Sequence, residues 1–256
     1  LAIVAVAAPA EGRSKKAPKW KPIVTRILDC AGSRDAECIE LWEKKLSGLG
    51  GGAGLGVREL LSSGNEVAVA SGLRVLEEIK DQSTAEYAAG LLGQDDYDFR
   101  AQVAEVVGRF KGKNIVEALS GLAASRRPFE REKAVEGLGR IGDPIGIPAL
   151  VAAVKDKFFS VRIKACEAMG HFDDKRVLEA LGGALASDGN SGVRIAAARA
   201  LGQTGSDGAV PLLVVGLEDA SFTVQSAAYD ALKAITKVDL GANADEWRTW
   251  LNRKNR

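Results

Sequence analysis

Side chains that could catalyse a reaction are few in this sequence. Its single histidine, His171, follows Gly170 and precedes Asp173 and Asp174. A general base needs a nucleophile or carboxylate held within hydrogen-bonding distance, and no motif around His171 supplies one. An imidazole after a helix-ending glycine can meet the free carbonyls there, and the aspartates are typical capping residues. The sequence therefore predicts no catalytic residue and no enzyme.

The glycine-rich stretch "GLGGGAGLG" (48–56) is the best candidate for a nucleotide site, because Gly48 to Ala53 fit the G-x-G-x-x-G/A pattern. That pattern binds a pyrophosphate only after a β-strand and at the start of a helix. Residues 37–47 instead have the charges and period of a helix. Val57 and Arg58 follow where a P-loop needs Lys and Ser or Thr. We expect an enlarged, flexible turn between helices and no bound cofactor.

Three cysteines could support either crosslinking or metal binding. Cys30 and Cys38 are close enough in sequence for a small disulfide loop if the compartment is oxidising. Cys166 lies in an alanine-rich helical run and is predicted to be a small buried hydrophobe. A structural zinc site needs four ligands at suitable spacing, and with one histidine and no CxxC pair no metal site is expected.

The sequence has an internal period, which determines the elements that position these residues. A glycine column recurs in steps of 31, 31 and 32 residues, and arginine and leucine columns recur with it. Their members are Gly108, Gly139, Gly170 and Gly202; Arg100, Arg131, Arg162 and Arg194; and Leu119, Leu150, Leu181 and Leu213.

Each period predicts two helices joined by a short turn. The first helix, as in 192–203, has apolar or small residues at helical spacing and ends at a glycine. The second, as in 210–217, carries Val210, Leu213 and Leu217 on one face. Apolar residues recur just before the first helix, where they can act as hydrophobic staples; these are Tyr97, Pro128, Phe159 and Phe222.

The segment "VRIAAARALGQTGSDGAVPLLVVGLED" (193–219) resembles a bacterial HEAT repeat of the short kind associated with phycobiliprotein lyases. The resemblance covers about 34–236 and is strong from 97 to 235. It implies an all-α, right-handed α-solenoid of antiparallel helix pairs. It also implies a non-enzymatic scaffold that binds a protein or peptide, with a lyase-like chromophore or cofactor accessory protein as the alternative. A DNA-binding HEAT-like protein is a second alternative.

The arginine column permits a functional and a structural interpretation. Four guanidinium groups along one ridge could bind phosphates or carboxylates of DNA or an acidic peptide. Alternatively, each arginine pairs with a carboxylate or carbonyl of a neighbouring repeat. The second is favoured, because this arginine belongs to the "VR" signature of the resembled family. Lys plus Arg is 35 against 34 Asp plus Glu, which argues against nucleic acid as the partner.

The second helices carry a candidate binding face. In HEAT-like stacks they usually line the concave surface, and their exposed positions combine acidic and small residues. We expect a shallow, mildly acidic groove that a partner can approach closely, although a merely solvated face would have the same composition. Its candidate residues are Glu86, Glu117, Gly121, Glu179 and Gly183.

Both ends of the chain depart from the repeat. Residues 1–10 are apolar and end in an A-x-A-like site, which predicts a signal-peptide remnant and export to the periplasm or exterior. Residues 11–21 are predicted to be a basic, disordered linker. The solenoid is expected over 22–236, with irregular capping helices at 22–47 and regular repeats from about 97. Residues 237–256 are expected to form a capping helix whose Trp247 and Trp250 cover the last repeat of a monomeric chain.

Overall fold

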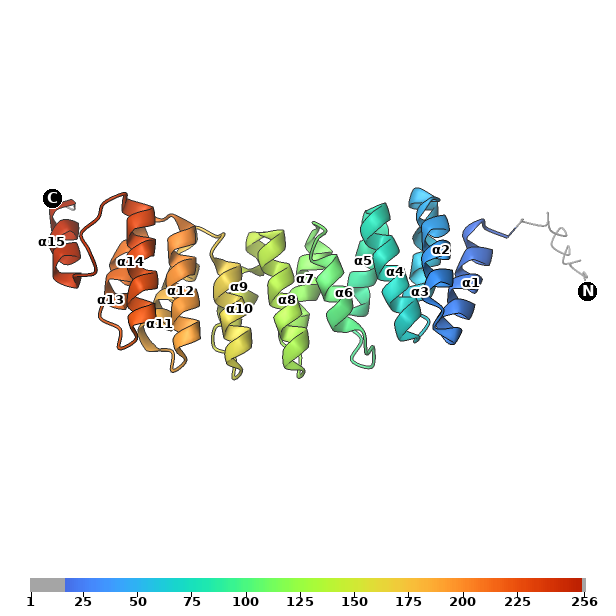
Figure 1. Cartoon of the computed structure of the whole chain (residues 1–256), viewed down its shortest axis with the longest axis horizontal. Coiled ribbons are helices and arrows are strands. Elements are labelled where there is room, and N and C mark those ends of the chain that lie inside the picture. Colours follow the sequence, from blue (N-terminus) through green and yellow to red (C-terminus); the bar gives the residue numbers. More distant parts are fainter. Residues whose placement is uncertain (1–16, 255–256) are drawn as a thin grey trace, which may run out of the picture. The chain divides into compact units, whose positions relative to one another are not determined.

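The structure is a computed structural model that describes residues 17–254. Within that range it contains fifteen α-helices, three short 3₁₀-helices and no strand (Figure 1). The expected all-α fold is therefore confirmed. The helices belong to two compact units, which divide between Ile79 and Lys80. The expected signal-peptide remnant, 1–10, and most of the expected linker, 11–21, lie outside the described residues.

The first unit is a small bundle in which each helix contributes one apolar face to a shared core. Ile27, Leu46, Leu60 and Leu76, one from each α-helix, are fully buried. Its elements are α1 (Trp20–Ser33), α2 (Ala36–Ser47), the 3₁₀-helix η1 (Gly50–Ala53), α3 (Gly54–Leu61) and α4 (Glu66–Ile79).

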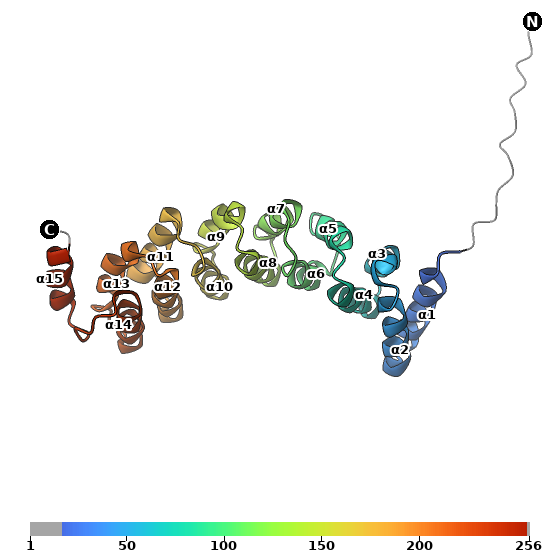
Figure 2. The same cartoon turned by 90° about the horizontal axis from the view of Figure 1, so that it is seen from above.

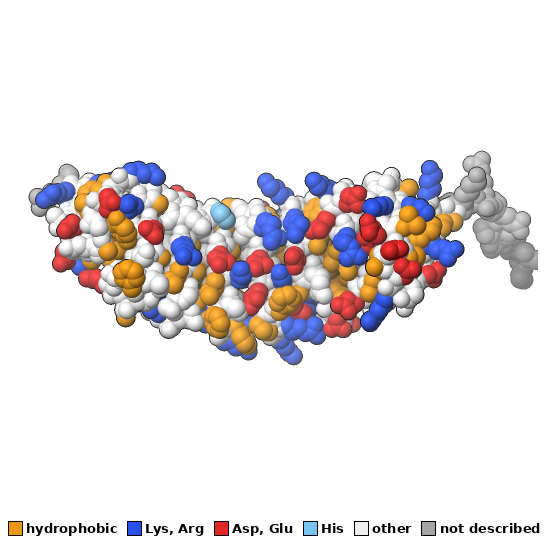
Figure 3. Space-filling view, viewed as in Figure 1, with side chains coloured by type: hydrophobic (Ala, Val, Ile, Leu, Met, Phe, Trp, Pro, Cys, Tyr) orange, Lys and Arg blue, Asp and Glu red, His pale blue; other side chains and the backbone are white. Residues whose placement is uncertain are grey.

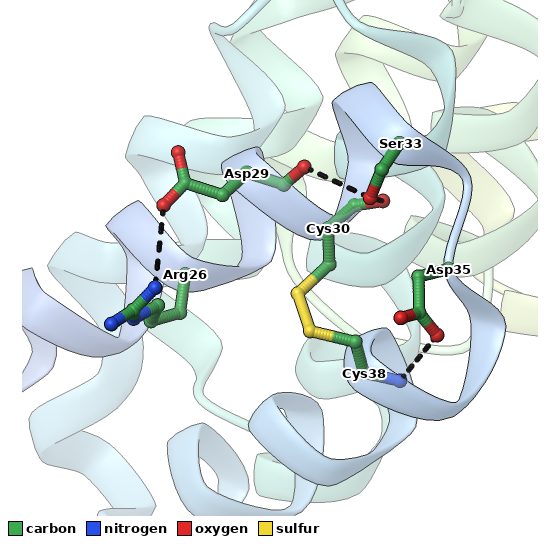
Figure 4. The surroundings of a disulfide bond; sticks show 6 residues. All are labelled: Arg26, Asp29, Cys30, Ser33, Asp35 and Cys38. Atoms are coloured by element: carbon green, nitrogen blue, oxygen red, sulfur yellow. Dashed lines mark hydrogen bonds and ion pairs between the residues drawn. A yellow bond between two sulfur atoms is a disulfide. The ribbon is translucent and has the colours of Figure 1, made fainter.

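A disulfide between Cys30 and Cys38 joins α1 to α2, with the two Cα atoms 5.8 Å apart (Figure 4). The turn between these helices is ordered by Asp35, whose carboxylate accepts a hydrogen bond from the Cys38 N–H at 3.0 Å. This is the N-cap arrangement that starts α2. The disulfide and the cap therefore hold the same turn.

The glycine stretch 48–56 differs from the flexible turn expected from the sequence. Residues Gly50–Ala53 form η1, and α3 already begins at Gly54. Gly56 is buried, and a Cβ placed on it would lie 3.0 Å from Val24 Cγ2 and 3.3 Å from Leu46 Cδ1. Its glycine is explained by close packing of α3 on α1 and α2. The segment before it is helix α2, so the strand that a dinucleotide fingerprint requires is not there.

The second unit is a solenoid of paired helices. We call α6, α8, α10, α12 and α14 the inner helices, and α5, α7, α9, α11 and α13 the outer helices. The inner helices span Arg100–Val107, Pro128–Ile141, Phe159–Met169, Ser191–Thr204 and Phe222–Thr236. The outer helices span Gln82–Leu91, Lys113–Leu122, Ile147–Ala153, Lys175–Ser187 and Val210–Gly216, with η2 (Pro144–Gly146) and η3 (Asp207–Ala209) leading into α9 and α13.

Within this unit the inner helices, which carry the arginine column, lie on the inside of the curve (Figure 2). The outer helices lie along its other side. The expectation that the second helix of each repeat lines the concave side is therefore wrong for this unit, in which the first helices line it (Figure 2). The candidate residues Glu117, Gly121, Glu179 and Gly183 therefore belong to the convex side of the unit.

Close contacts between neighbouring inner helices explain this curvature. A Cβ on Gly139 of α8 would lie 2.5 Å from Ala168 Cβ of α10, and one on Gly202 of α12 would lie 2.7 Å from Ala231 Cβ of α14. A Cβ on Gly108 would lie 2.6 Å from the Cα of Gly137. Because the glycine column lets these backbones approach, the spacing between repeats is short on this side and the stack bends toward it.

The second unit ends at α15 (Ala244–Lys254), which packs against α13. Trp247 is fully buried, and its indole N–H donates to the Gly241 carbonyl at 2.8 Å. Trp250 is half-buried and packs edge-on against Trp247, with the ring centroids 5.9 Å apart. Lys254 pairs with Asp207, which lies in η3, at 3.0 Å. Both indoles thus cover the end of the last repeat.

Candidate functional site

The arginine column forms a ladder that connects successive loops of the second unit. Arg162 illustrates the pattern: its Nε and Nη2 donate to the two carboxylate oxygens of Asp188, at 2.7 and 2.8 Å, in the loop of the following repeat. Its Nη1 donates to the carbonyl of Asp156, in the loop of its own repeat, at 2.9 Å. One guanidinium therefore ties two adjacent loops together.

The same geometry occurs on both sides of Arg162. Arg131 donates to both oxygens of Asp156 at 2.6 and 2.7 Å, and Arg194 to both oxygens of Asp219 at 2.7 and 2.9 Å. Bidentate pairing of this kind fixes the orientation of both side chains as well as their distance. The acceptors, Asp156, Asp188 and Asp219, recur in steps of 32 and 31 residues. This aspartate column was not predicted from the sequence, although it recurs with the same period as the arginines.

Each aspartate also organises its own loop. Asp156, Asp188 and Asp219 accept hydrogen bonds from the backbone N–H two residues further on, at 2.7 to 2.9 Å. Burial acts to raise the pKa of Asp156 and Asp188, but hydrogen bonds from Arg131, Arg162 and these backbone groups outweigh it, and both pKa values lie below the usual range. The hydrogen bond from Arg194 lowers the pKa of Asp219 most. All three carboxylates are thus held ionised.

The ladder changes its partners at both ends. Arg100, at its start, is buried and pairs with Asp95 at 2.7 Å and Glu130 at 2.9 Å. At the far end Gln225 replaces arginine and donates to the Asp219 carbonyl at 2.7 Å. Every guanidinium in the column is engaged by carboxylates within the chain. The column is thus a structural connection between repeats, and its charge is not free to bind an external anion.

The inner face carries a second set of ion pairs, which joins α6, α8 and α10. Lys133 reaches Glu105 at 3.0 Å and Glu136 at 3.5 Å. Lys164 reaches the same Glu136 at 3.2 Å and Glu167 at 3.1 Å. The two lysines are shared among three glutamates, so every charge of this set is paired and the set as a whole keeps one negative charge in excess.

The outer face contains two grooves, each between neighbouring outer helices. The first, between α5 and α7, has a volume of about 770 Å³ and is lined by Glu117 and Gly121. The second, between α9 and α11, has a volume of about 970 Å³ and is lined by Glu179 and Gly183. Four of the five predicted binding residues therefore line two separate grooves. The fifth, Glu86, lines neither and accepts a hydrogen bond from Gln82 at 3.2 Å.

Glycines in the grooves differ from those of the inner helices. Gly90, Gly121 and Gly183 are exposed, and a Cβ on any of them would have nothing within 4 Å. Their backbones are helical, so no unusual φ requires glycine either. A helical glycine costs about 1 kcal/mol of stability relative to alanine. Neither packing nor backbone geometry explains these three residues, whereas both grooves have such a glycine on their surface.

The residues with catalytic potential are not assembled into a site. His171 is exposed, and its ring has no hydrogen bond or ion pair within the described part of the chain. Cys166 is fully buried in α10, and burial raises the pKa of its thiol to about 12, so it stays protonated. Among residues 17–254 no three side chains of metal-binding type gather in one place. In that same range, no helix has the length and apolar character needed to cross a membrane.

The expected hydrophobic staples are only partly formed. Tyr97 is half-buried and packs edge-on against Phe99 at 5.5 Å. Phe159 and Phe222, however, are 54% and 79% exposed, so they cannot act as staples. The N-terminal ends of α10 and α14 are instead ordered by the ladder aspartates, which leaves these rings facing solvent.

Comparison with known proteins identifies the repeat family of the solenoid. A family model described as HEAT repeats matches residues 85–162, 119–194 and 183–240, which together make up more than half of the chain. No curated protein sequence matches it. The complex of CpcE and CpcF of phycocyanin lyase from Nostoc sp. PCC7120 is similar in structure, with 25% identity, a TM-score of 0.51 and coverage of 68% of this chain and 70% of that chain.

Other solved structures share the fold alone. YibA of Escherichia coli is 21% identical, with a TM-score of 0.51 and coverage of 87% of this chain and 77% of that one. An engineered protein is 20% identical, with a TM-score of 0.50 and coverage of 85% and 71%. The repeat period, the paired helices, the arginine ladder and the family match agree, and the chain belongs to the HEAT-repeat family.

Proposed function

We propose that this HEAT-repeat protein is a non-enzymatic scaffold that binds a protein or peptide through the two grooves of its outer face. The observation that carries the proposal is the presence of Gly121 and Gly183 in positions where neither packing nor backbone geometry requires glycine. A bare helix surface lets a ligand backbone approach closely. Glu117 and Glu179, each held only by an i,i+4 lysine at 3.6 Å, would supply charge beside it.

The experiment replaces both glycines with a side chain that fills the grooves. Gly121→Leu together with Gly183→Leu should leave the fold at least as stable, because leucine favours helix over glycine. The same variant should no longer retain the partner that the immobilised wild-type protein captures from an extract of the native host and that mass spectrometry identifies. Ala186→Leu is the matched control, since Ala186 is exposed on α11 but does not line the groove.

A charge-reversed variant tests the same surface independently. Glu117→Lys with Glu179→Lys should abolish saturable binding of the captured partner. Retained binding in both the leucine and the lysine variants would refute the assignment to the outer grooves, while leaving the scaffold function open to another surface.

Similarity to the CpcE and CpcF complex favours a second candidate, an accessory protein for attaching a chromophore or cofactor. It predicts that protein purified from the native host carries a coloured tetrapyrrole, seen as visible absorbance. A colourless preparation would count against it. The DNA-binding alternative receives less support, because the ladder arginines are paired within the chain. It would require an affinity for DNA that falls steeply with salt.

We also propose that the protein is exported, because a Cys30–Cys38 disulfide persists in an oxidising compartment such as the periplasm. Mass spectrometry of the native protein tests this. A mature N-terminus at Glu11 together with an intact disulfide is expected. Reduced cysteines and an uncleaved apolar segment would contradict export.

A further inference from the structure

Three phenylalanines are exposed at the N-terminal ends of two adjacent inner helices. Phe129, at the start of α8, is 57% exposed, and Phe158 and Phe159, at the start of α10, are 41% and 54% exposed. Figure 3 shows the face of the molecule that carries the inner helices. Along its lower edge, at the N-terminal ends of these two helices, apolar side chains lie beside lysine and arginine side chains. We call Phe129, Phe158 and Phe159 the aromatic rim.

The fold itself does not require two of these three aromatic side chains. In the other repeats the position of Phe129 is held by Asp98, Ser160, Gly192 and Thr223. The position of Phe158 is held by Arg127, Asn190 and Ser221. Since polar residues serve equally well there, packing within the repeat does not explain Phe129 or Phe158. Phe159 stands in a column that also holds Tyr97, Pro128 and Phe222, and it joins the rim because 54% of it is exposed beside Phe158. Exposed apolar side chains gathered in one place typically mark an interaction surface.

The acidic side chains around the rim have partners in the described part of the chain, whereas several of the basic ones do not. Acidic side chains nearby are already engaged: Asp98 by Arg127 at 3.3 Å, Glu130 by Arg100 at 2.9 Å, and Asp156 by Arg131 at 2.6 Å. Glu132 accepts a hydrogen bond from Ser160. By contrast, Arg126, Lys155 and Lys157 are exposed and form no ion pair with any described residue. Among the described residues, three unpaired cations thus stand against one carboxylate, Glu132, that is bonded only to a neutral hydroxyl, so the net uncompensated charge at this edge is positive.

One of these unpaired cations, Lys157, lies against the rings together with two cations that are already ion-paired, Arg131 and Lys133. The Lys157 ammonium is 5.3 Å from the centre of the Phe158 ring, and the Arg131 guanidinium lies 5.6 Å from the same ring. Lys133 is 5.5 Å from the Phe129 ring on the neighbouring helix. A ligand that covers the rings is thus placed beside cations, and an apolar ligand with carboxylates next to its apolar side chains satisfies both features.

We propose that the aromatic rim is a docking surface for an acidic segment of a partner protein in which carboxylates alternate with aromatic or aliphatic side chains. The apolar side chains cover Phe129 and Phe159, and the carboxylates pair with Lys157, Arg126 and Lys155. The three rings lie outside both outer grooves, whereas Arg126 also lines the first groove and Lys155 the second, so the rim borders the grooves. The substitutions that test the rim are therefore made at the rings and at Lys157, none of which lines a groove.

The test measures fluorescence anisotropy of a labelled peptide made of Asp-Glu-Leu-Phe repeats, titrated with the full-length protein. Saturable binding is expected, and it should weaken at least tenfold in Phe129→Ser/Phe159→Ser, because burying one phenylalanine is worth about a factor of ten. Lys157→Glu should weaken it further and reduce its salt dependence. Phe222→Ser is the matched control. Phe222 also lies at a helix start and is more exposed than the rim residues, at 79%, but it is preceded by Ser221 and followed by Thr223, so its substitution should not change the affinity.

Other outcomes would overturn the proposal. Equal affinity for a peptide in which lysine replaces both acidic residues would remove the charge argument. Failure of the acidic peptide to bind, or unchanged binding in Phe129→Ser/Phe159→Ser, would remove the rim. Binding to phosphatidylserine vesicles in place of the peptide would assign the rim to a membrane surface. Because the substituted rings are exposed, thermal unfolding should be unchanged, which separates lost binding from lost folding.

Discussion

Replacing Arg131 with glutamine tests whether the arginine ladder holds the repeats together. Arg131 is 6% exposed, donates to both oxygens of Asp156 and donates to the Ser125 carbonyl at 2.9 Å. Glutamine is the residue that the chain itself uses at the equivalent position 225. The substitution leaves Asp156 with the Phe158 N–H as its remaining strong donor.

The size of the expected loss of stability follows from the burial of both Arg131 and Asp156. Breaking a buried ion pair by removing one member costs about 3–5 kcal/mol. Because the loop borders solvent and Asp156 keeps a backbone donor, we expect a loss near the lower limit, about 3 kcal/mol. Asp156→Asn in the Arg131→Gln background should recover part of that loss, since it removes the uncompensated charge.

Urea unfolding followed by far-UV circular dichroism measures the free energy of unfolding of each variant. In Arg131→Gln, hydrogen exchange should show that α8 and α10 open before the other helices. Arg176→Gln is the control, because its pair with Asp174 is exposed and should contribute little. The reasoning would be refuted if Arg131→Gln and Arg176→Gln had the same effect, or if the double variant were less stable than the sum of the single ones.

Three further predictions concern pH, glycine and the disulfide. In the folded state the pKa values of Asp156, Asp188 and Asp219 lie below the ordinary 3.8. The stability that these ionised carboxylates contribute is therefore complete above pH 3.8 and is lost as the pH falls through the lower, folded-state pKa values. Urea titrations at a series of pH values should show the free energy of unfolding fall over this range, and Asp188→Asn should make the fall smaller. Gly139→Ala should destabilise the protein by about 1–3 kcal/mol, because the added methyl group overpacks against Ala168. Gly121→Ala should stabilise it by about 0.5–1 kcal/mol, because the added methyl group meets nothing and alanine favours the helix. Thermal unfolding of both variants measures the two effects. Cys38→Ser should lower the stability of the first unit by about 2 kcal/mol, seen as faster hydrogen exchange in α1 and α2 but not in α12.

The repeat period was sufficient to predict the paired helices, because a column that includes Gly139 and Gly202 records one packing environment, close contact with an alanine of the next inner helix, that is used repeatedly. It was not sufficient to predict which side is concave. Curvature depends on the distance between helices on the two sides. The sequence shows glycine at both Gly139 and Gly121, although a Cβ on Gly139 would collide with Ala168 and one on Gly121 would have nothing within 4 Å. The arginine column was readable in the sequence, yet the carboxylates it pairs with are separated from it by 25 or 26 residues and required the fold.

The site was predicted less completely than the fold. Glu117 and Glu179 share a column, but they line different grooves, because each groove forms between one particular pair of outer helices. Phe159 fits the staple pattern by spacing, and only its exposure distinguishes it from a packed residue. A sequence pattern shows which residue type stands at each position, whereas the exposure of its side chain depends on whether a neighbouring repeat packs over it.

The arginine ladder also bears on how such a chain changes length during evolution. Each arginine uses only its own loop and the next one, so removing residues 157–188 would join Asp156 to Gly189 and bring Arg194 into the register that Arg162 had held. Arg131 would keep Asp156, and Gly139 would meet Ala200, another small residue, in place of Ala168. Duplication of one period preserves these ladder contacts in the same way. Gain or loss of a whole repeat therefore disturbs the ladder less than a shift of one residue within it.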